Sequence, residues 1–185
     1  ALFNRISGVV SGALRTSRSL LQYPATRWID AVAARLVLYL LTDALVAYLI
    51  LSGILSLSDT RAVLEMQPVV AGFAAAALLG TGVGLINGVL NGFVPVWQRV
   101  WGILTRPLFL ASGIFWIYED LPRVAQDLLW WNPLVHVTAL VRTGFYITYD
   151  PGFLSGLLLS LPGLVLLAFG LLLMRRFHLS VLARR

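Results

Sequence analysis

Long apolar segments, separated by short polar ones, dominate the pattern of this chain. Three of the four longest run for more than 20 residues, and the other is interrupted by Arg106-Pro107. At a rise of about 1.5 Å per residue, a helix of about 20 residues crosses the hydrocarbon core of a bilayer. The pattern therefore predicts an all-α membrane protein, a polytopic bundle with four transmembrane helices in a single domain. The four segments are residues 36–57, 68–90, 100–118 and 152–174.

Residues 1–24 have a different pattern, in which apolar positions such as Ile6 and Val10 recur with a period of about 3.6. Basic and polar side chains fall between them, and Pro24 ends the pattern. This arrangement is typical of a helix that lies on the membrane surface or docks on a partner. We therefore expect a cytoplasmic segment over residues 1–30 that contains an N-terminal amphipathic helix.

Residues 119–151 are too polar to cross lipid, because they hold six charged side chains. Pro122 and Pro133 interrupt any continuous helix. The segment predicts two short helices, at about 122–130 and 134–147, that re-enter the membrane from the outer side without crossing it. Non-helical backbone at that depth must be buried in protein or line a wet cavity.

The composition agrees with a membrane location. The chain is 59% hydrophobic and only 12% charged, whereas soluble domains carry about 25% charged residues. All 14 basic residues are Arg, so the chain lacks the Lys of a GxxxxGK[ST] phosphate-binding loop. There is no Cys, and His136 and His178 lie far apart. We therefore expect no metal site, no catalytic grouping and no nucleotide bound by that loop.

The charges divide unequally between two sets of segments. Residues 1–35, 91–106 and 175–185 hold eleven Arg and one acidic residue, whereas residues 58–67 and 119–151 hold three Arg and six acidic residues. Arg-rich segments stay cytoplasmic, so both chain ends are predicted inside, with residues 175–185 as a cytoplasmic tail. This placement explains the net charge of +6 better than nucleic-acid binding does.

Small residues recur every four positions along residues 68–90 and just beyond. Such spacing lets two helix backbones approach closely in lipid. Plain helix packing is one interpretation, and a dimer interface that moves during a transport cycle is the other. The row is Gly72, Ala76, Gly80, Gly84, Gly88 and Gly92, of which the last four are the predicted packing residues.

Asp43 lies near the middle of the span at 36–57, where a carboxylate costs roughly 2.5–3.5 kcal/mol on insertion scales. With Tyr39 and Tyr48 nearby, Asp43 either lines a polar pathway or bonds to another helix. Arg106 next to Pro107 is expected to reach the membrane interface. Trp116 and other Trp residues lie at span ends, as in an aromatic belt.

Two stretches carry a resemblance to a known family. RPLFLASGIFWIYEDLPR at 106–123 and WNPLVHVTALVRTGFY at 131–146 resemble the permease subunit of type-2 ABC exporters, most closely the capsular polysaccharide export branch. SRSLLQYPATRWIDAVAARL at 17–36 is similar to the cytoplasmic link before that family's third helix. The resemblance covers about residues 10–178.

The resemblance implies a homodimer of permeases with two separate ATPase subunits that bind ATP and Mg and hydrolyse the ATP. This chain, in the bacterial inner membrane, would contact lipid and a polysaccharide substrate on a lipid anchor. Three groups of residues then acquire expected roles. Coupling to the ATPase falls to Arg15, Arg18, Leu21, Tyr23 and Arg99, the substrate pathway to Tyr39, Asp43, Arg106 and Trp116, and the outer re-entrant motif to Asn132, Pro133, His136 and Arg142.

The chain departs from the family pattern in one respect. The family has six membrane helices and an N-terminal interface helix, so we expect this chain to lack that helix, the first span and most of the second. Export of another glycan, a lipid or a drug remains an alternative, as do a membrane-embedded glycan or lipid transferase and a non-transporting scaffold.

Overall fold

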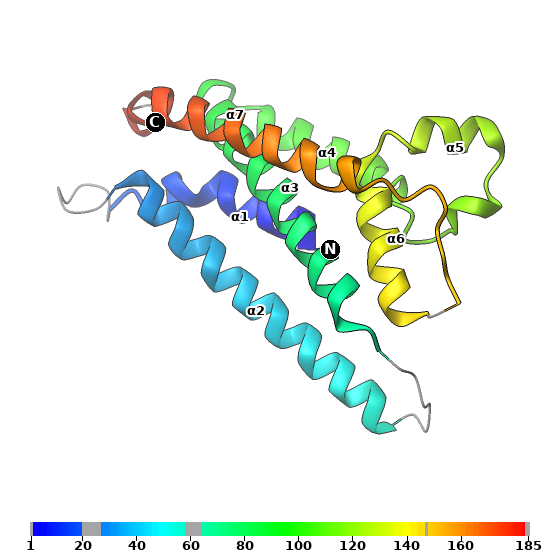
Figure 1. Ribbon diagram of the computed structural model, residues 1–185. Helices are drawn as coiled ribbons and strands as arrows, with labels where there is room; N and C mark the ends of the chain where they lie inside the picture. The colour runs from blue at the N-terminus through cyan, green and yellow to red at the C-terminus, as the bar shows by residue number, and fades with distance from the viewer. Residues whose placement is uncertain (1, 20–26, 58–63, 147, 184–185) are drawn as a thin grey trace.

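The computed structural model describes the chain except for residues 1, 20–26, 58–63, 147 and 184–185 (Figure 1). The described residues form helices joined by turns and irregular segments, as the sequence predicts. The helices are α1 (Leu2–Thr16), α2 (Trp28–Leu57), α3 (Met66–Phe93), α4 (Trp97–Leu110), the 3₁₀ turn η2 (Tyr118–Asp120), α5 (Arg123–Leu129), α6 (Pro133–Phe145) and α7 (Gly156–Ala183).

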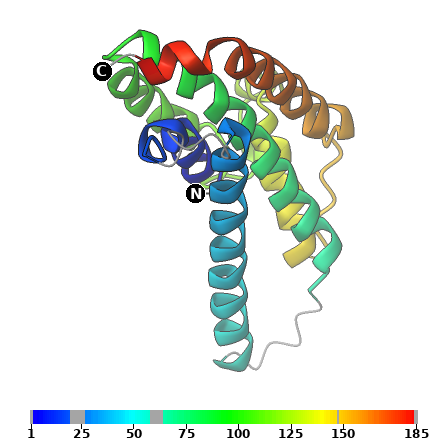
Figure 2. The same cartoon turned by 90° about the vertical axis from the view of Figure 1, so that its left-hand side faces the viewer.

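Helix α3 is the centre of the bundle, with α1, α6 and α7 packed around it (Figures 1 and 2). Of the residues in its most apolar stretch, 61% are buried, against 17% in α7 and none in α2. Within the described residues, these three helices are long and apolar enough to cross a membrane. Helices α2 and α7 therefore present most of their apolar side chains to lipid or to another subunit.

Helix α1 packs lengthwise on α3, and the two helices run in the same direction. Ile6 and Val10 of α1 share an apolar core with Leu85 and Val89 of α3. The amphipathic helix predicted from the sequence is present over Leu2–Thr16, and its apolar face packs on α3. The apolar face that the pattern reveals is real, but the small residues of α3 offer it a groove inside the bundle.

The predicted row of packing glycines makes very close contacts. Gly80 and Gly84 face α1, Gly88 faces both α1 and α7, and Gly92 faces Val181 of α7. A Cβ atom on either Gly84 or Gly92 would lie 2.7 Å from a valine carbon, so neither position has room for a side chain. The four glycines therefore pack helices of this chain against one another.

Helix α2 diverges from α3 toward its C-terminal end, as Figure 2 shows. It begins at Trp28 rather than at residue 36. Helix α7 is likewise longer than predicted and continues through the expected tail to Ala183. Both helices extend past their apolar segments. The Arg residues found there have good helix propensity, and their charged groups can reach water.

The predicted span at 100–118 is the clearest difference. Helix α4 has 14 residues and ends at Leu110, which at about 1.5 Å per residue is too short to cross the hydrocarbon core. Residues 111–117 follow as turns and bends, with Gly113 at a φ of 73°. A left-handed residue stops an α-helix, so residues 100–118 do not form one continuous transmembrane helix.

The next segment holds two helices, α5 and α6, close to the ranges predicted for 122–130 and 134–147. Helix α6 runs antiparallel to the first half of α3, since Gly72 faces Val141 and Gly144 faces Val69. The Glu65 N–H also donates to the Gly144 carbonyl at 3.0 Å. Helix α6 therefore lies beside a membrane-spanning segment of α3.

Candidate functional site

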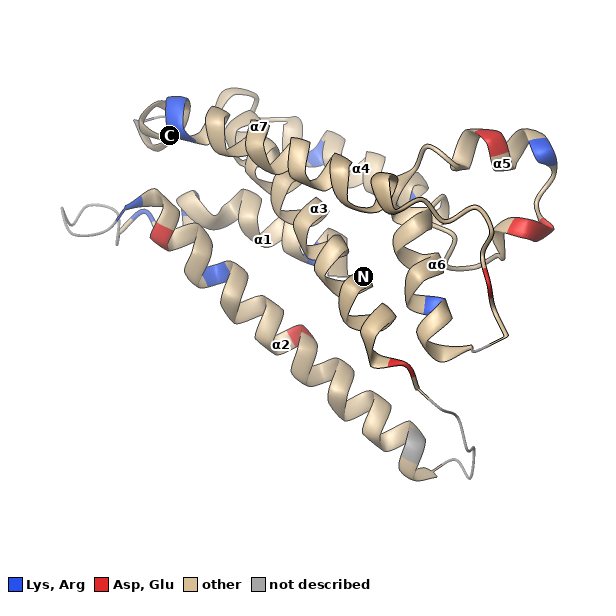
Figure 3. Cartoon of the chain, in the orientation of Figure 1, with Lys and Arg blue, Asp and Glu red and all other residues tan. Residues whose placement is uncertain are grey.

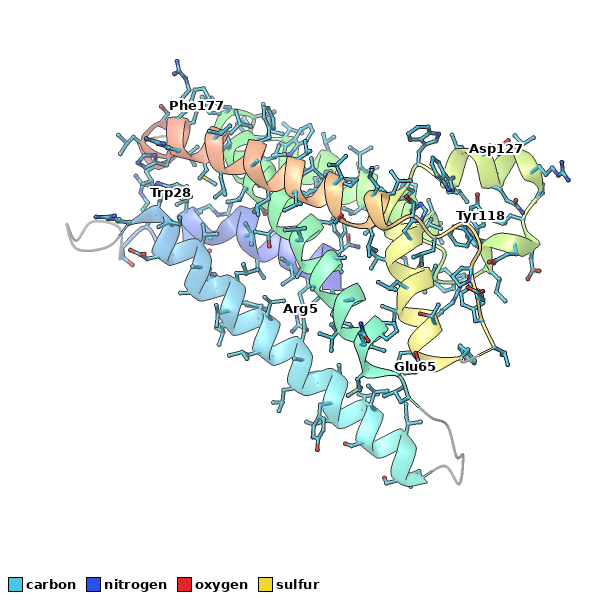
Figure 4. The ribbon with its side chains drawn as sticks, viewed as in Figure 1. Arg5, Trp28, Glu65, Tyr118, Asp127 and Phe177 are labelled. Atoms are coloured by element: carbon cyan, nitrogen blue, oxygen red, sulfur yellow. The ribbon has the colours of Figure 1, made fainter. Side chains whose placement is uncertain are left out.

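An ion pair joins α1 to the middle of α2. Arg5 Nη1 donates a hydrogen bond to Asp43 Oδ1. The Arg5 guanidinium carbon also lies 5.8 Å from the centre of the Tyr39 ring, in a cation–π geometry. Figure 4 shows Arg5 between α2 and α3. Two of the four predicted pathway residues, Tyr39 and Asp43, thus belong to one polar cluster with Arg5.

The exposure of the pair shows which way it faces. The Arg5 side chain is 48% exposed and that of Asp43 is 11% exposed. Asp43 Oδ2 is buried and accepts no hydrogen bond from the described residues. Charged groups at the depth of a span face protein or water, because hydrocarbon does not solvate them. The face of the bundle that carries Arg5 is therefore not a lipid-facing surface.

The sequence did not identify Arg5 as the partner of Asp43. In the pattern of residues 1–24, Arg5 falls on the polar face and counts among the membrane-flanking charges. The structure places it opposite Asp43 instead, so ten of the eleven Arg residues in that set remain as flanking charges. Arg5 meets Asp43 because α1 packs within the bundle beside α2.

Most of the remaining charges lie toward two ends of the bundle, one mainly basic and the other mainly acidic (Figure 3). The basic end is where α1, α3 and α7 finish, at Thr16, Phe93 and Ala183. The acidic end is where α3 begins and where Glu119 lies beside Tyr149. Its acidic residues are Glu65, Glu119, Asp120, Asp127 and Asp150.

Side chains of α6 hold the non-helical segment that follows α4. Arg142 donates to the carbonyl of Gly113 at 2.7 Å and to that of Trp116 at 3.0 Å. Asn132 and Thr138 donate to the two preceding carbonyls, of Ala111 and Ser112, at 3.0 and 2.7 Å. We call this set of bonds the α6 brace. It satisfies backbone groups that a helix would otherwise pair internally, as backbone at membrane depth requires.

His136 connects the turn before α6 to the start of α7. It is fully buried and lies 2.8 Å from the Trp130 carbonyl through Nε2. The Ser155 N–H donates to His136 Nδ1 at 3.3 Å. A backbone N–H can only donate, so Nδ1 is the acceptor, and Nε2 must carry the proton given to Trp130. His136 is therefore held as the neutral Nε2–H tautomer in a structural role.

Asn132 and Pro133 start α6 in the manner their sequence predicts. The Asn132 side chain caps the helix by accepting from the Leu134 N–H at 3.1 Å, and Pro133 occupies the first helical position. All four predicted residues of the re-entrant motif thus have a defined role. Thr138, which belongs to the same brace, was not indicated by the sequence, whereas its partner Ser112 lies in the stretch that carries the family resemblance.

An apolar cavity of about 360 Å³ separates the N-terminal turn of α1 from the α6 brace. Arg142 lies at its lining, with its guanidinium already bonded to residues 113–116. Other lining residues are Phe3, Gly72, Phe73, Phe109 and Val137. The cavity can accommodate hydrocarbon rather than sugar, because few of its groups can form hydrogen bonds.

The other predicted site residues are spread more widely. Arg106 is exposed on α4, and no described interaction joins it or Trp116 to the Arg5–Asp43 pair. Arg15, Arg18 and Arg99 are exposed at the basic end. Leu21 and Tyr23 lie outside the described residues. Among the described residues, no group of His, Asp or Glu has the geometry of a metal site.

Two Tyr residues at the acidic end have perturbed ionisation. Burial and the nearby charges of Asp127 and Glu119 raise the pKa of the Tyr118 hydroxyl. Burial and Glu119 likewise raise the pKa of Tyr149. Tyr118 donates to the Gln126 carbonyl at 2.8 Å and stacks on Phe153, with ring centroids 3.9 Å apart. These contacts tie η2, α5 and the start of α7 together.

Among the described residues, three helices are long and apolar enough to cross a membrane, and two of them expose most of their apolar stretch, as in a polytopic membrane protein. Residues 2–146 match the family described as ABC-2 type transporter, and the chain belongs to that family. It is 30% identical over 154 residues to the polysialic acid transport protein KpsM of Escherichia coli, covering 83% of this chain and 58% of that protein.

Two further relatives carry related names. The capsule polysaccharide export inner-membrane protein CtrC of Neisseria meningitidis serogroup B is 27% identical, covering 92% of this chain and 64% of that protein. The corresponding protein BexB of Haemophilus influenzae is 29% identical, covering 89% of this chain and 65% of that protein. The chain thus spans less than two thirds of the length of these relatives.

Proposed function

We propose that this chain is the membrane-spanning part of an ATP-driven exporter that moves a capsule-type polysaccharide across the inner membrane. The observation that carries the proposal is the Arg5–Asp43 pair beside Tyr39, in which Arg5 is half-exposed, in a chain of the ABC-2 transporter family. The names of its relatives, which include polysialic acid transport and capsule polysaccharide export, support the choice of cargo.

The cluster has the chemistry that a glycan pathway needs. A guanidinium carries five N–H donors, of which Asp43 takes one. The others can bind sugar hydroxyl or carboxylate oxygens, and the Tyr39 ring provides a face for a sugar ring. Because the charges of Arg5 and Asp43 cancel, the pair adds polarity to the pathway without a net charge that would trap an acidic polymer.

The energy source lies on another subunit. This chain has no Lys and hence no P-loop, so ATP and Mg bind to a separate ABC ATPase. The basic end would receive the motion of that ATPase, through Arg15, Arg18 and Arg99 together with the segment that holds Leu21 and Tyr23. The excess of Arg at this end supports a cytoplasmic position for it and for both chain ends.

A second copy of the permease completes the pathway in this proposal. Helix α2 buries none of the residues in its most apolar stretch within the chain, and the exposed side of Arg5 needs a polar neighbour. In a homodimer, the exposed face of α2 and the face that carries Arg5 can together surround a water-filled channel. Helices α5 and α6 would form the re-entrant pair that shapes its outer exit.

Complementation tests the proposal. Cells that lack the gene for this protein are given the wild-type gene or variants, and surface polysaccharide and membrane-bound ATPase subunit are both measured. The neutral pair Arg5→Gln/Asp43→Asn should keep the ATPase bound but lower export at least about tenfold, the effect of one lost charged contact. Ser52→Ala, an exposed change on α2, is the control.

Two results would contradict the proposal. Unchanged surface polysaccharide in the gene deletion would remove polysaccharide as the cargo, leaving another glycan, a lipid or a drug. Wild-type export by the Arg5→Gln/Asp43→Asn variant would mean that Arg5 and Asp43 do not take part in the substrate pathway.

A further inference from the structure

A pocket of about 490 Å³ opens at the basic end, where the last turns of α1, α3 and α7 meet the early part of α2. We call it the basic pocket. Three Arg residues from two helices and the segment after α1 line it, and no Asp or Glu among the described residues does. Its polar lining residues include Arg15, Arg18, Arg35, Asn91 and Gln98.

The positive charge in this pocket is not neutralised within the described chain. Arg35 Nε donates to the Ser17 hydroxyl at 3.3 Å, and no ion pair between described residues involves the three Arg side chains. Like charges gathered around one cavity repel each other, so an anion bound among them lowers the free energy. Guanidinium groups match phosphate oxygens in geometry as well as in charge.

Asn91 adds a polar side chain to the pocket lining. Its Oδ1 atom is itself buried and accepts no hydrogen bond from the described residues. The amide therefore adds polarity beside the three Arg side chains, which remain the groups that can bind a phosphate.

The surroundings place the pocket at headgroup depth. Trp28 lies against His178 with ring centroids 5.9 Å apart, and Trp97 Nε1 donates to Asn87 at 2.8 Å. Trp residues gather where hydrocarbon meets headgroups. The pocket also has apolar walls at Val9, Leu14, Val181 and Leu182, which suit the start of acyl chains.

We propose that the basic pocket binds the phosphate headgroup of a glycerophospholipid from the leaflet at this end of the bundle. Two glycines keep the space open, because a Cβ on Gly8 would meet nothing within 4 Å and one on Gly12 only the Thr16 hydroxyl. The proposal does not depend on the cargo. It gives Arg15 and Arg18 a lipid ligand in addition to the proposed ATPase contact.

Native mass spectrometry of the purified full chain tests this. The delipidated protein is titrated with dioleoylphosphatidylglycerol, with dioleoylglycerol as the phosphate-free comparison. One saturable molecule of phosphatidylglycerol should bind. The triple variant Arg15→Gln/Arg18→Gln/Arg35→Gln should weaken it on the order of a hundredfold. Arg175→Gln removes one charge from the same end outside the pocket and should bind like wild type.

A filling variant separates the pocket from its charges. Gly12→Leu keeps every Arg but occupies the space, so it should also lose the saturable lipid while the helix content of the protein stays unchanged. Gly8→Leu repeats the test should the first variant misfold.

Three outcomes would overturn the proposal. The first is equal lipid binding by wild type, the triple variant and Gly12→Leu, which would mean only annular lipid. The second is displacement of the lipid by equimolar glycerol 3-phosphate, which would mean a site for free phosphate esters. The third is loss of ATPase binding in the triple variant with lipid binding unchanged.

Discussion

The carbonyl oxygen of Ser7 lies directly against Gly84, where a Cβ atom would be only 2.9 Å away. The same relationship recurs one turn before and one turn after, between Phe3 and Gly80 and between Ser11 and Gly88. Both series advance by four residues, so α1 and α3 run parallel and in register along this contact. A carbonyl that meets Cα–H groups at each step is typical of close helix pairs in membranes.

This register predicts that Gly84→Leu destabilises the bundle by about 3 kcal/mol, or abolishes folding, since backbone atoms of α1 would have to move. Gly53→Leu is the matched control: the same change in α2 meets nothing within 4 Å. Thermal unfolding of the two variants in detergent compares them. Equal stability of Gly84→Leu and Gly53→Leu would contradict the register.

The Arg5–Asp43 pair predicts a strong coupling between two helices. Asp43→Asn leaves the guanidinium unpaired at membrane depth, which costs about 3–5 kcal/mol when a buried pair loses one partner, and less here because Arg5 is 48% exposed. The neutral pair Arg5→Gln/Asp43→Asn should recover part of the loss. A double-mutant cycle of unfolding free energies measures this coupling, and additive effects of the two single changes would contradict the contact.

The sequence predicts the helical membrane fold well because apolar segments of sufficient length have few alternatives in lipid. It also predicts the packing role of Gly80 and Gly84, since small residues at four-residue spacing have a local signature. Two features of the structure are not predicted by the sequence. A helix with one apolar face looks the same whether it lies on a membrane or beside α3, and Arg5 becomes the partner of Asp43 only once that choice is made.

The end of α4 is the other feature that the sequence pattern does not determine. Residues 111–117 are apolar enough to continue a helix, and the hydropathy pattern therefore predicts one transmembrane helix over residues 100–118. Gly113 breaks the helix, and the α6 brace holds the non-helical segment in place through Arg142, which lies 26 to 29 positions away in the sequence. Local hydropathy carries no information about hydrogen bonds of that range.

The brace predicts that Arg142 cannot be replaced by Lys. One guanidinium serves the carbonyls of Gly113, Ile114 and Trp116, whereas an ammonium lacks the planar fork that reaches them together. Arg142→Lys should therefore speed amide hydrogen exchange around residues 111–117, reflecting a loss of roughly 2 kcal/mol. Arg123→Lys, an exposed change on α5, should leave this exchange unaltered, and equal exchange in both variants would count against the brace.

The two bonds of His136 predict its tautomer. Nitrogen NMR of selectively labelled protein should show a pyridine-like Nδ1 and a pyrrole-like Nε2, because Ser155 donates to the first and Trp130 accepts from the second. A pyrrole-like Nδ1 would mean that the bond to the start of α7 does not form.

The last prediction concerns the path of the chain between Glu119 and Asp150. The Tyr149 hydroxyl donates to Glu119 Oε2 at 3.4 Å, so the segment starts and finishes at the same end of the bundle. Between these points α6 runs beside α3 and ends next to Glu65, without reaching the basic end. We therefore expect α5 and α6 to re-enter the membrane rather than cross it.

Cysteine labelling tests this path without interference, because the natural chain has no Cys. Glu119→Cys and Asp150→Cys should both react with a membrane-impermeant maleimide added outside intact cells. Arg99→Cys, at the basic end, should react only after the membrane is opened, as the excess of Arg there places it in the cytoplasm. Reaction of one acidic-end cysteine from outside and the other only from inside would mean a true crossing. Reaction of Arg99→Cys from outside would instead invert the orientation while leaving the re-entrant path intact, so the two conclusions fail separately.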